Sequence, residues 1–312
     1  MALPTYADPL ERAWHLAYKV ICTAIFIFLI APILVIIPLS FNAEPYFTFT
    51  TKMLSLDPEG YSLRWYDSLL TLGMQAPDVP RDGNWFSDMW NNAAWVKAAK
   101  NSIIIGFWST ILATTLGTLA ALGLSRSEMP YRRVVMAILI SPMIVPIIIV
   151  ATGMFFFYSS PCGLVGLNCG RLTATYPGVI MAHAVLGIPF VIITVTATLS
   201  GFDQSLIRAS ASLGANSRTT FFKVIMPLIL PGVVSGALFA FITSFDEVVM
   251  VMFIAGPEQQ TIPRQMWNGI REAISPAILA VATILVIISI GLLAAVELLR
   301  RRGERLRGVS PH

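Results

Sequence analysis

The sequence has little charge and few of the side chains that soluble enzymes use for chemistry. Charged residues make up 12% of its 312 positions, whereas a soluble domain carries about 25%. Histidine and cysteine occur three times each. The chain has no G-x-x-x-x-G-K-S/T phosphate loop, no H-E-x-x-H motif and no paired metal-ligand cluster. We therefore expect a chain that is not an enzyme, binds no cofactor or metal and does not itself hydrolyse ATP.

Long uncharged runs take the place of the missing charge, and 56% of the residues are hydrophobic. Each run is long enough for the roughly 20 helical residues that cross a hydrocarbon core of about 30 Å. A β-barrel would instead show strands of about ten alternating residues. We predict an all-α integral membrane protein with six transmembrane helices within residues 20–300, between a tail at 1–19 and a tail at 301–312. The predicted spans are about residues 20–41, 101–125, 134–158, 172–200, 224–250 and 273–298.

Lysine and arginine are divided unequally between the predicted loops. With the long loop 42–100 set aside, thirteen lie on the side of both termini and three on the other side. The positive-inside rule therefore predicts that both termini are cytoplasmic in a bacterial inner membrane and that loop 42–100 is periplasmic. Because these charges form no basic stripe, we expect the lipid bilayer and not nucleic acid as their partner.

Two cysteines, Cys162 and Cys169, lie in one short predicted periplasmic loop. The periplasm permits oxidation, so a disulfide between them is one expectation. Two free thiols are the alternative, because the sequence gives no separation between the two Cα atoms.

The predicted cytoplasmic loop 201–223 is patterned as structure and not as a passive connection. Asp203 can cap a helix over residues 204–213, and Gly214 supplies the left-handed residue that ends it. Ser217 can cap a second helix that continues into the next span. A helix of this length cannot cross a bilayer, so we expect it at the membrane face with Leu206, Ile207 and Leu213 available to a partner.

Residues 208–215, followed by 223–227, resemble the EAA loop of binding-protein-dependent ABC importer permeases. The resemblance implies the type I permease fold and a cytoplasmic coupling helix that docks in a cleft of an ATPase. Where the family has Glu-Ala-Ala this chain has Arg-Ala-Ser, and Ser212 replaces the usual Asp, so an ion pair with the ATPase is not implied. The coupling residues carried over are Asp203, Arg208, Ala209, Ser210, Leu213, Gly214 and Ala215.

Segments 61–66, 101–102, 246–247 and 274–276 are similar to the spermidine/putrescine, PotC-like branch of that family. This resemblance implies import of a polyamine or related cation, although the branch also includes transporters of opines, phosphonates and other small organic solutes. The implied partners are a second homologous permease, forming a heterodimer, and a periplasmic solute-binding protein. Two ATPase subunits would bind ATP and Mg and drive alternating access.

Three polar residues within the predicted spans are candidates for the translocation pathway. Asp246 and Glu247 follow a long uncharged run, and charges at such depth usually face a watery path or a paired cation. His183 fits a packing hydrogen bond or a proton relay. An ion-gradient-driven secondary transporter is the alternative of another class, but it commonly shows two related halves, and no internal repeat is evident here.

Overall fold

The computed structural model describes residues 8–126, 128–160, 170–201, 203, 205–272 and 275–306. This part of the chain is mainly helical, and no segment within it forms a β-strand. Cys162, Cys169 and the disulfide expected between them lie outside the described residues. The helices are α1 (Pro9–Leu39), α2 (Thr51–Leu54), η1 (Pro58–Gly60), α3 (Arg64–Thr71), α4 (Gly83–Asn92), α5 (Ala94–Leu124), α6 (Arg132–Ile144), α7 (Ile147–Ser159), α8 (Tyr176–Ser200), α9 (Ser205–Ser212), α10 (Ser217–Thr220), a π-helical turn (Phe221–Ile225), α11 (Met226–Asp246), α12 (Val249–Ile254), η4 (Pro257–Gln259), α13 (Ile262–Glu272) and α14 (Ala277–Leu306).

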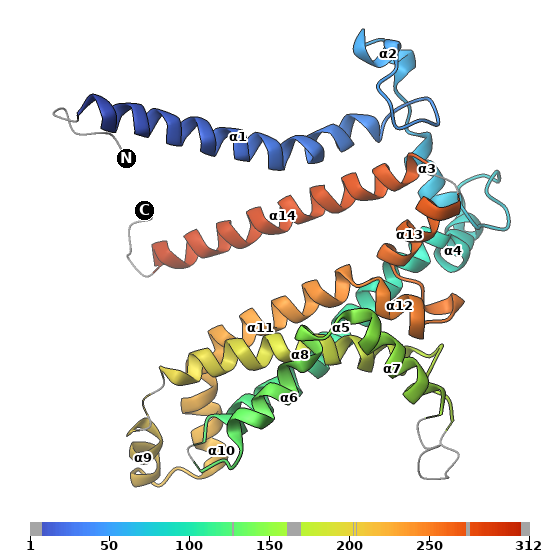
Figure 1. The fold of residues 1–312 in the computed structure, drawn as a ribbon. Coiled ribbons are helices and arrows are strands. Elements are labelled where there is room, and N and C mark those ends of the chain that lie inside the picture. Colours follow the sequence, from blue (N-terminus) through green and yellow to red (C-terminus); the bar gives the residue numbers. More distant parts are fainter. Residues whose placement is uncertain are drawn as a thin grey trace. The chain divides into compact units, whose positions relative to one another are not determined.

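The helices belong to two compact units, Met1–Leu72 with Gly269–His312 and the intervening residues 73–268. In the first unit α14 packs against α1 and α3 (Figure 1). The end of α1 is joined to α3 by a 2.7 Å hydrogen bond between the hydroxyls of Ser40 and Tyr66. Trp65 adds a second link, because its Nε1 donates to the Asn42 carbonyl at 2.7 Å. These bonds fix α3 at the end of the first helix.

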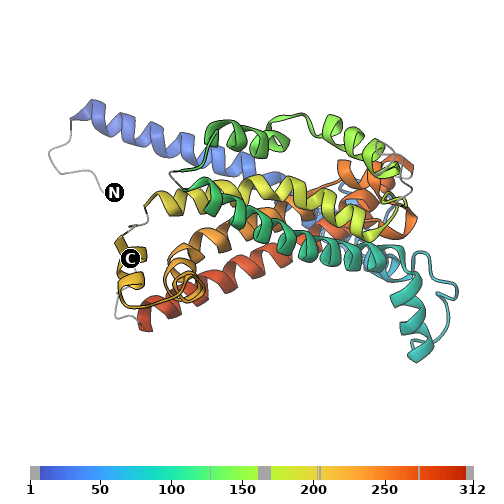
Figure 2. The ribbon, with the colours of Figure 1, turned by 90° about the horizontal axis from the view of Figure 1, so that it is seen from below.

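The second unit is built around α5, α8 and α11, which lie side by side in both ribbon views (Figures 1 and 2). Glycines permit the close approach of these helices. A Cβ atom at Gly187 would lie 2.9 Å from Ala240 Cβ and 3.1 Å from Ala113 Cβ. A Cβ atom at Gly236 would lie 2.9 Å from the Cα atom of Val191. Small residues at such contacts are typical of helices packed within a membrane, where close van der Waals contact stabilises association.

The apolar helices agree in part with the six predicted spans. Among the described residues, four helical segments are long and apolar enough to cross a membrane: α1, α5, α8 and Ser217–Asp246. The pair α6 and α7 makes a fifth crossing if it is counted as one broken span. The apolar part of α14, Ala277–Gly291, is shorter than these. The described residues therefore form a multi-pass helical architecture. Helix length and apolarity give four or five crossings among them, not the six that the sequence predicted.

Two of the predicted spans are interrupted. The helix expected at 134–158 bends by 102° between α6 and α7, where Val145 is extended. Val145 precedes Pro146, and a residue before proline is pushed out of the helical region. The helix expected at 224–250 ends at Asp246, because Glu247 is extended with ψ 123°, and α12 begins again at Val249. Sequence hydrophobicity could not reveal either break.

We predict that Gly236→Ala lowers the stability of the helix bundle. The new methyl group would press on the α8 backbone at Val191, and overpacking of this kind costs about 1–3 kcal/mol. Gly153→Ala is the matched control, because a Cβ atom there meets nothing within 4 Å and alanine favours helix. Thermal unfolding in detergent should show a lower midpoint for Gly236→Ala alone. Equal midpoints for the two variants would contradict this packing.

Candidate functional site

The predicted coupling segment forms a short helix, α9, with a defined beginning and end. The carboxylate of Asp203 accepts hydrogen bonds from the hydroxyl of Ser205 at 2.6 Å and from its backbone N–H at 2.8 Å. These bonds hold the pKa of the Asp203 carboxyl below its usual value, with the side-chain bond contributing most. At the other end Gly214 has φ +80°, and the N–H of Ala215 donates to the Ser210 carbonyl at 3.0 Å. This is the geometry of a glycine-terminated helix.

A hairpin connects α9 to the next long helix. Asn216 caps α10, with its side chain accepting from Thr219 N–H at 2.8 Å, whereas the sequence predicted Ser217 as the cap. The two side chains are adjacent and chemically similar, so the sequence could not separate them. The hydroxyls of Ser210 and Thr220, both buried, lie 3.0 Å apart and join α9 to α10. A π-helical turn, Phe221–Ile225, then leads directly into α11. Ser210, which stands where the EAA pattern has its second alanine, therefore joins α9 to the hairpin.

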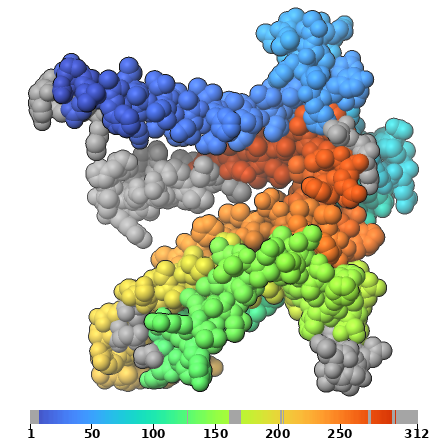
Figure 3. Space-filling model, in the orientation of Figure 1, coloured from blue at the N-terminus to red at the C-terminus, as the bar shows by residue number. Residues whose placement is uncertain are grey.

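The two sides of α9 have different surroundings. Leu206 and Leu213 are exposed, and Leu213 keeps 88% of its surface accessible at the end of the helix. The segment that contains α9 lies at the surface of the second unit, in the yellow region of Figure 3. Ile207, Arg208 and Ala211 belong to the other side and line a cavity. Because α9 is too short to cross a bilayer, its exposed leucines are available to a partner.

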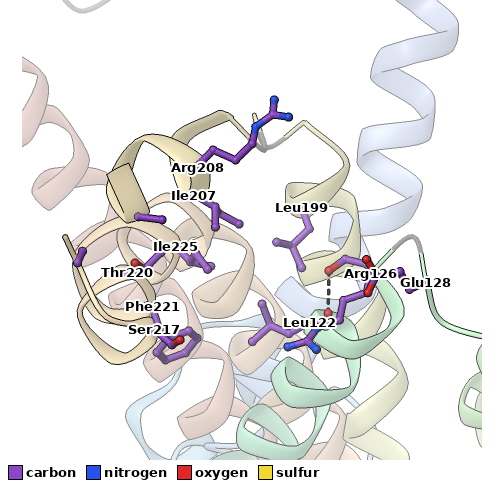
Figure 4. Close-up of a pocket in the computed structure, with 13 residues that line it drawn as sticks. Leu122, Arg126, Glu128, Leu199, Ile207, Arg208, Ser217, Thr220, Phe221 and Ile225 are labelled. Atoms are coloured by element: carbon purple, nitrogen blue, oxygen red, sulfur yellow. Dashed lines mark hydrogen bonds between the residues drawn. The ribbon is translucent and has the colours of Figure 1, made fainter. Parts of the chain in front are cut away.

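The cavity has a volume of about 770 Å³ and lies between α9, the hairpin and the ends of α5 and α8 (Figure 4). Its floor is apolar, and Arg126, Glu128 and Arg208 contribute charge. In Figure 4 the Arg126 guanidinium lies beside Leu122, and Arg208 extends from α9 at the rim. Its lining residues are Leu122, Ser125, Arg126, Glu128, Leu199, Ile207, Arg208, Ala211, Ala215, Ser217, Thr220, Phe221 and Ile225.

His183 lies in the interior of the three-helix core. It is 1% exposed, and its Nδ1 lies 2.8 Å from the hydroxyl of Ser244 on α11. Ser109 on α5 donates to the same hydroxyl at 2.9 Å. The Nε2 atom of His183 has no hydrogen-bond partner within the described part of the chain. The structure therefore places His183 in a polar contact that joins α5, α8 and α11.

Asp246 and Glu247 lie at the break between α11 and α12 but in different surroundings. Glu247 is half-buried, and its Oε1 accepts from the N–H groups of Val249 at 2.6 Å and Met250 at 3.0 Å. Its carboxylate therefore satisfies the first turn of α12. Asp246 is exposed on the isolated chain. The two adjacent acids therefore have different surroundings. Glu247 is bonded to the backbone of α12, whereas Asp246 is exposed and can contact solvent or a solute.

A polar clamp at the other end of the core was not anticipated from the sequence. Asn101 on α5 is 4% exposed, and its Nδ2 donates to the carbonyls of Glu258 at 2.8 Å and Gln260 at 2.9 Å. Its Oδ1 accepts from the Tyr176 hydroxyl at 2.7 Å. The neighbouring Ser102 accepts from the N–H of Ile262 at 2.9 Å. Together these bonds fix the turn between α12 and α13 to α5 and α8. The only sequence signal was the Asn101-Ser102 pair, which did not indicate its partners.

Comparisons with known proteins agree on the kind of molecule. Residues 113–305 match the family described as "Binding-protein-dependent transport system inner membrane component". The spermidine/putrescine transport system permease protein PotC of Haemophilus influenzae is 28% identical over 280 residues, covering 90% of this chain and 95% of that protein. The putrescine transport system permease protein PotI of Escherichia coli is 27% identical, covering 91% of this chain and 92% of that protein.

Solved structures show the same fold at lower identity. A bacterial ABC transporter involved in the import of the acidic polysaccharide alginate aligns with a TM-score of 0.64 and 16% identity, covering 95% of this chain and 98% of that chain. A second structure, of the bacterial alginate ABC transporter in complex with its alginate pentasaccharide-bound periplasmic protein, gives a TM-score of 0.58. The likeness extends over nearly the whole of both chains.

We predict that Asn101→Leu loosens the turn between α12 and α13. The change removes the donor of the Gln260 carbonyl and leaves the Glu258 carbonyl with only the Tyr176 hydroxyl at 3.2 Å, and each lost hydrogen bond costs about 0.5–1.5 kcal/mol. Hydrogen exchange of residues 255–262 should accelerate, and the turn should become more sensitive to protease. Asn91→Leu is the control, because the Asn91 amide bonds only to Ser87 within its own exposed helix. Unchanged exchange in Asn101→Leu would rule out the clamp.

Proposed function

Because the chain belongs to the family of inner membrane components of binding-protein-dependent transport systems, and to its PotC-like branch of ABC importer permeases, we propose that it couples ATP hydrolysis by a partner to passage of a polyamine. The observation that carries the proposal is α9, a capped helix with exposed leucines that leads through a short hairpin into the long helix α11. The ATPase would dock on this exposed face. The chain itself would bind no nucleotide, with ATP and Mg held by the ATPase.

The hairpin geometry supports transmission of motion from α9 to the core. The Ser210–Thr220 contact ties α9 to α10, and α10 continues without a break through the π-helical turn into α11. A push on Leu213 would therefore move the beginning of α11 and not only the loop. Of the coupling residues expected from the sequence, Leu213 is well exposed for docking, Ser210 joins α9 to α10, and Gly214 and Ala215 end α9. Asp203 caps the first turn.

The proposed assembly contains this chain, a second homologous permease in a heterodimer, two ATPase subunits and a periplasmic solute-binding protein. The permease spans the bacterial inner membrane with both termini in the cytoplasm, as the distribution of lysine and arginine indicates. ATP binding would close the ATPase dimer, and the docked coupling helices would follow. The pathway would then open to the periplasm and receive the solute.

A polyamine is the proposed solute because the relatives named for spermidine and putrescine match along almost the whole chain. Asp246 offers an exposed carboxylate at the end of α11, where it would offset part of the cost of removing water from a cationic solute. Glu247 serves mainly as the cap of α12. His183 would contribute to the core contact and not to proton transfer.

We predict that Leu213→Glu uncouples the permease from its ATPase. A charge replaces an apolar side chain whose burial would stabilise docking by about 1.5–3 kcal/mol, and α9 keeps its caps. In lipid, ATP hydrolysis by the co-expressed complex should be stimulated by binding protein loaded with spermidine or putrescine, and this stimulation should be lost in Leu213→Glu. Leu54→Glu, at another exposed leucine, is the control. Stimulation that survives in Leu213→Glu would disprove docking through this face. If binding protein loaded with an opine or a phosphonate stimulated ATP hydrolysis and polyamine-loaded protein did not, the proposed solute would be wrong.

We predict that Asp246→Asn slows polyamine transport roughly threefold to tenfold, because a carboxylate that attracts the moving cation is removed. The affinity of the binding protein for the solute should not change. Asp246→Glu should restore most of the rate, while Glu247→Gln, which keeps an oxygen acceptor for α12, should have the smaller effect. Transport assays in proteoliposomes measure all three variants. Native rates in Asp246→Asn would exclude this carboxylate from the pathway.

A further inference from the structure

Helix α4 carries polar and aromatic side chains on opposite sides. The polar side lines a cavity of about 600 Å³ with Asn84, Ser87, Asp88, Asn91 and Asn92. The carboxylate of Asp88 also accepts hydrogen bonds from the backbone N–H groups of Gln75 and Ala76, each at 3.0 Å, so the preceding segment packs on this side. On the other side Phe86 and Trp90, one helical turn apart, keep 54% and 56% of their surface exposed. The aromatic side therefore remains available to a neighbour.

Lys100 of α5 fixes the direction in which the aromatic side points. Its ammonium donates to the Trp90 carbonyl at 2.7 Å and lies 4.5 Å from the centre of the Trp90 ring. Ala93, between the two helices, is extended with ψ 121°, so α4 leaves the direction of α5 (Figure 2). The Trp90 ring therefore lies beside the first turns of α5, on the side of α4 that faces this membrane-crossing helix.

The distribution of charge fixes the depth of these first turns. Residues 101–125 are uncharged, and Lys100 and Arg126 stand directly before and after them. Placing either charge within the hydrocarbon core is costly, so the core lies between them. The 25 residues form a helix about 37 Å long, which exceeds a core of about 30 Å by only about 7 Å. Lys100, and the Trp90 ring beside its ammonium, therefore lie close to the edge of the core.

The aromatic side of α4 also continues into an exposed apolar stripe on α5. Ile104, Phe107 and Ile111 follow Lys100 at helical spacing, and all three are exposed. Together α4 and this stripe form an apolar corner with a positive charge where they meet. A bilayer fits both parts, because acyl chains can cover the stripe while the phosphate groups lie at the level of the Lys100 ammonium. Tryptophan and lysine are the side chains that commonly occupy this boundary.

We propose that α4 lies in the interface of the bilayer, at the end of α5 opposite to α9, with Phe86 and Trp90 inserted beside the first part of the acyl chains. The polar side, with Asp88, stays in water. Amphipathic helices bind membranes in this way, parallel to the surface and buried by about 5–10 Å. The helix thereby anchors the segment 73–93 to the membrane surface and leaves the cavity on its polar side open to water.

Photo-crosslinking tests the proposal without ATP or a transported solute, so its outcome is independent of the proposed transport function. The complete complex, with its second permease and binding protein, is placed in phosphatidylcholine nanodiscs. The variants are Phe86→benzoylphenylalanine and, as the matched control, Asn91→benzoylphenylalanine. Both positions are exposed, but they lie on opposite sides of α4. Mass spectrometry of the irradiated complex then identifies what is joined to the peptide that contains α4.

We expect lipid adducts at position 86 to exceed those at position 91 roughly tenfold, because only the aromatic side contacts acyl chains. Equal lipid labelling at the two positions would overturn the proposal. Crosslinks from position 86 to the second permease, to the binding protein or to another copy of this chain would overturn it as well, since a protein would then cover this side.

Fluorescence gives a second measurement on the unlabelled protein. The emission that is lost in Trp90→Phe belongs to Trp90, and its quenching by brominated lipids reports the depth of the ring. Bromine near the head-group end of the acyl chain should quench this emission roughly twofold more than bromine near the methyl end, because the ring lies at the edge of the core. Stronger quenching by acrylamide in the water than by either lipid would contradict the proposed insertion.

Discussion

The close contact of α5, α8 and α11 determines the geometry of both ends of the permease. Gly187 and Gly236 allow the helices to approach until backbone atoms nearly touch. At one end, α5 and α8 then bring Asn101 and Tyr176 within reach of the same turn. At the other end, the same helices form two walls of the cavity behind α9. Wider helix spacing would separate both sets of contacts at once.

Interruptions of the helices follow a second constraint, which is that the backbone polar groups left unpaired at a helix end need partners. Where α11 stops, the carboxylate of Glu247 accepts the first N–H groups of α12. Where α9 stops, the left-handed Gly214 lets the chain turn back so that Ala215 reaches a helix carbonyl. A broken helix is thus completed by a nearby side chain or by a glycine.

Sequence reasoning succeeded where the determining interactions are local. The apolar runs locate the long helices, and Asp203 and Gly214 mark a short helix whose described part, Ser205–Ser212, lies within the expected 204–213. Sequence reasoning failed where two contacting residues are far apart in the chain, or where two neighbouring residues could fill the same role. Asn101 and Glu258 are separated by 157 positions, so their contact leaves no local pattern. Asp246 and Glu247 are adjacent acids, and only the backbone turn between α11 and α12 assigns one of them to capping. Pro146 marks the place of the bend after Val145, but the sequence does not give its size of 102°.

The division of α9 into an outer face and a cavity face has a thermodynamic consequence. A helix of eight residues is too short to bend independently on its two sides, so a displacement favoured by one neighbour is felt by the other. Two ligands that bias the position of one rigid element are linked, and each changes the equilibrium affinity of the other by the same factor. A ligand in the cavity would therefore change the affinity of a partner that docks at Leu213, and docking of that partner would change the occupancy of the cavity by the same factor.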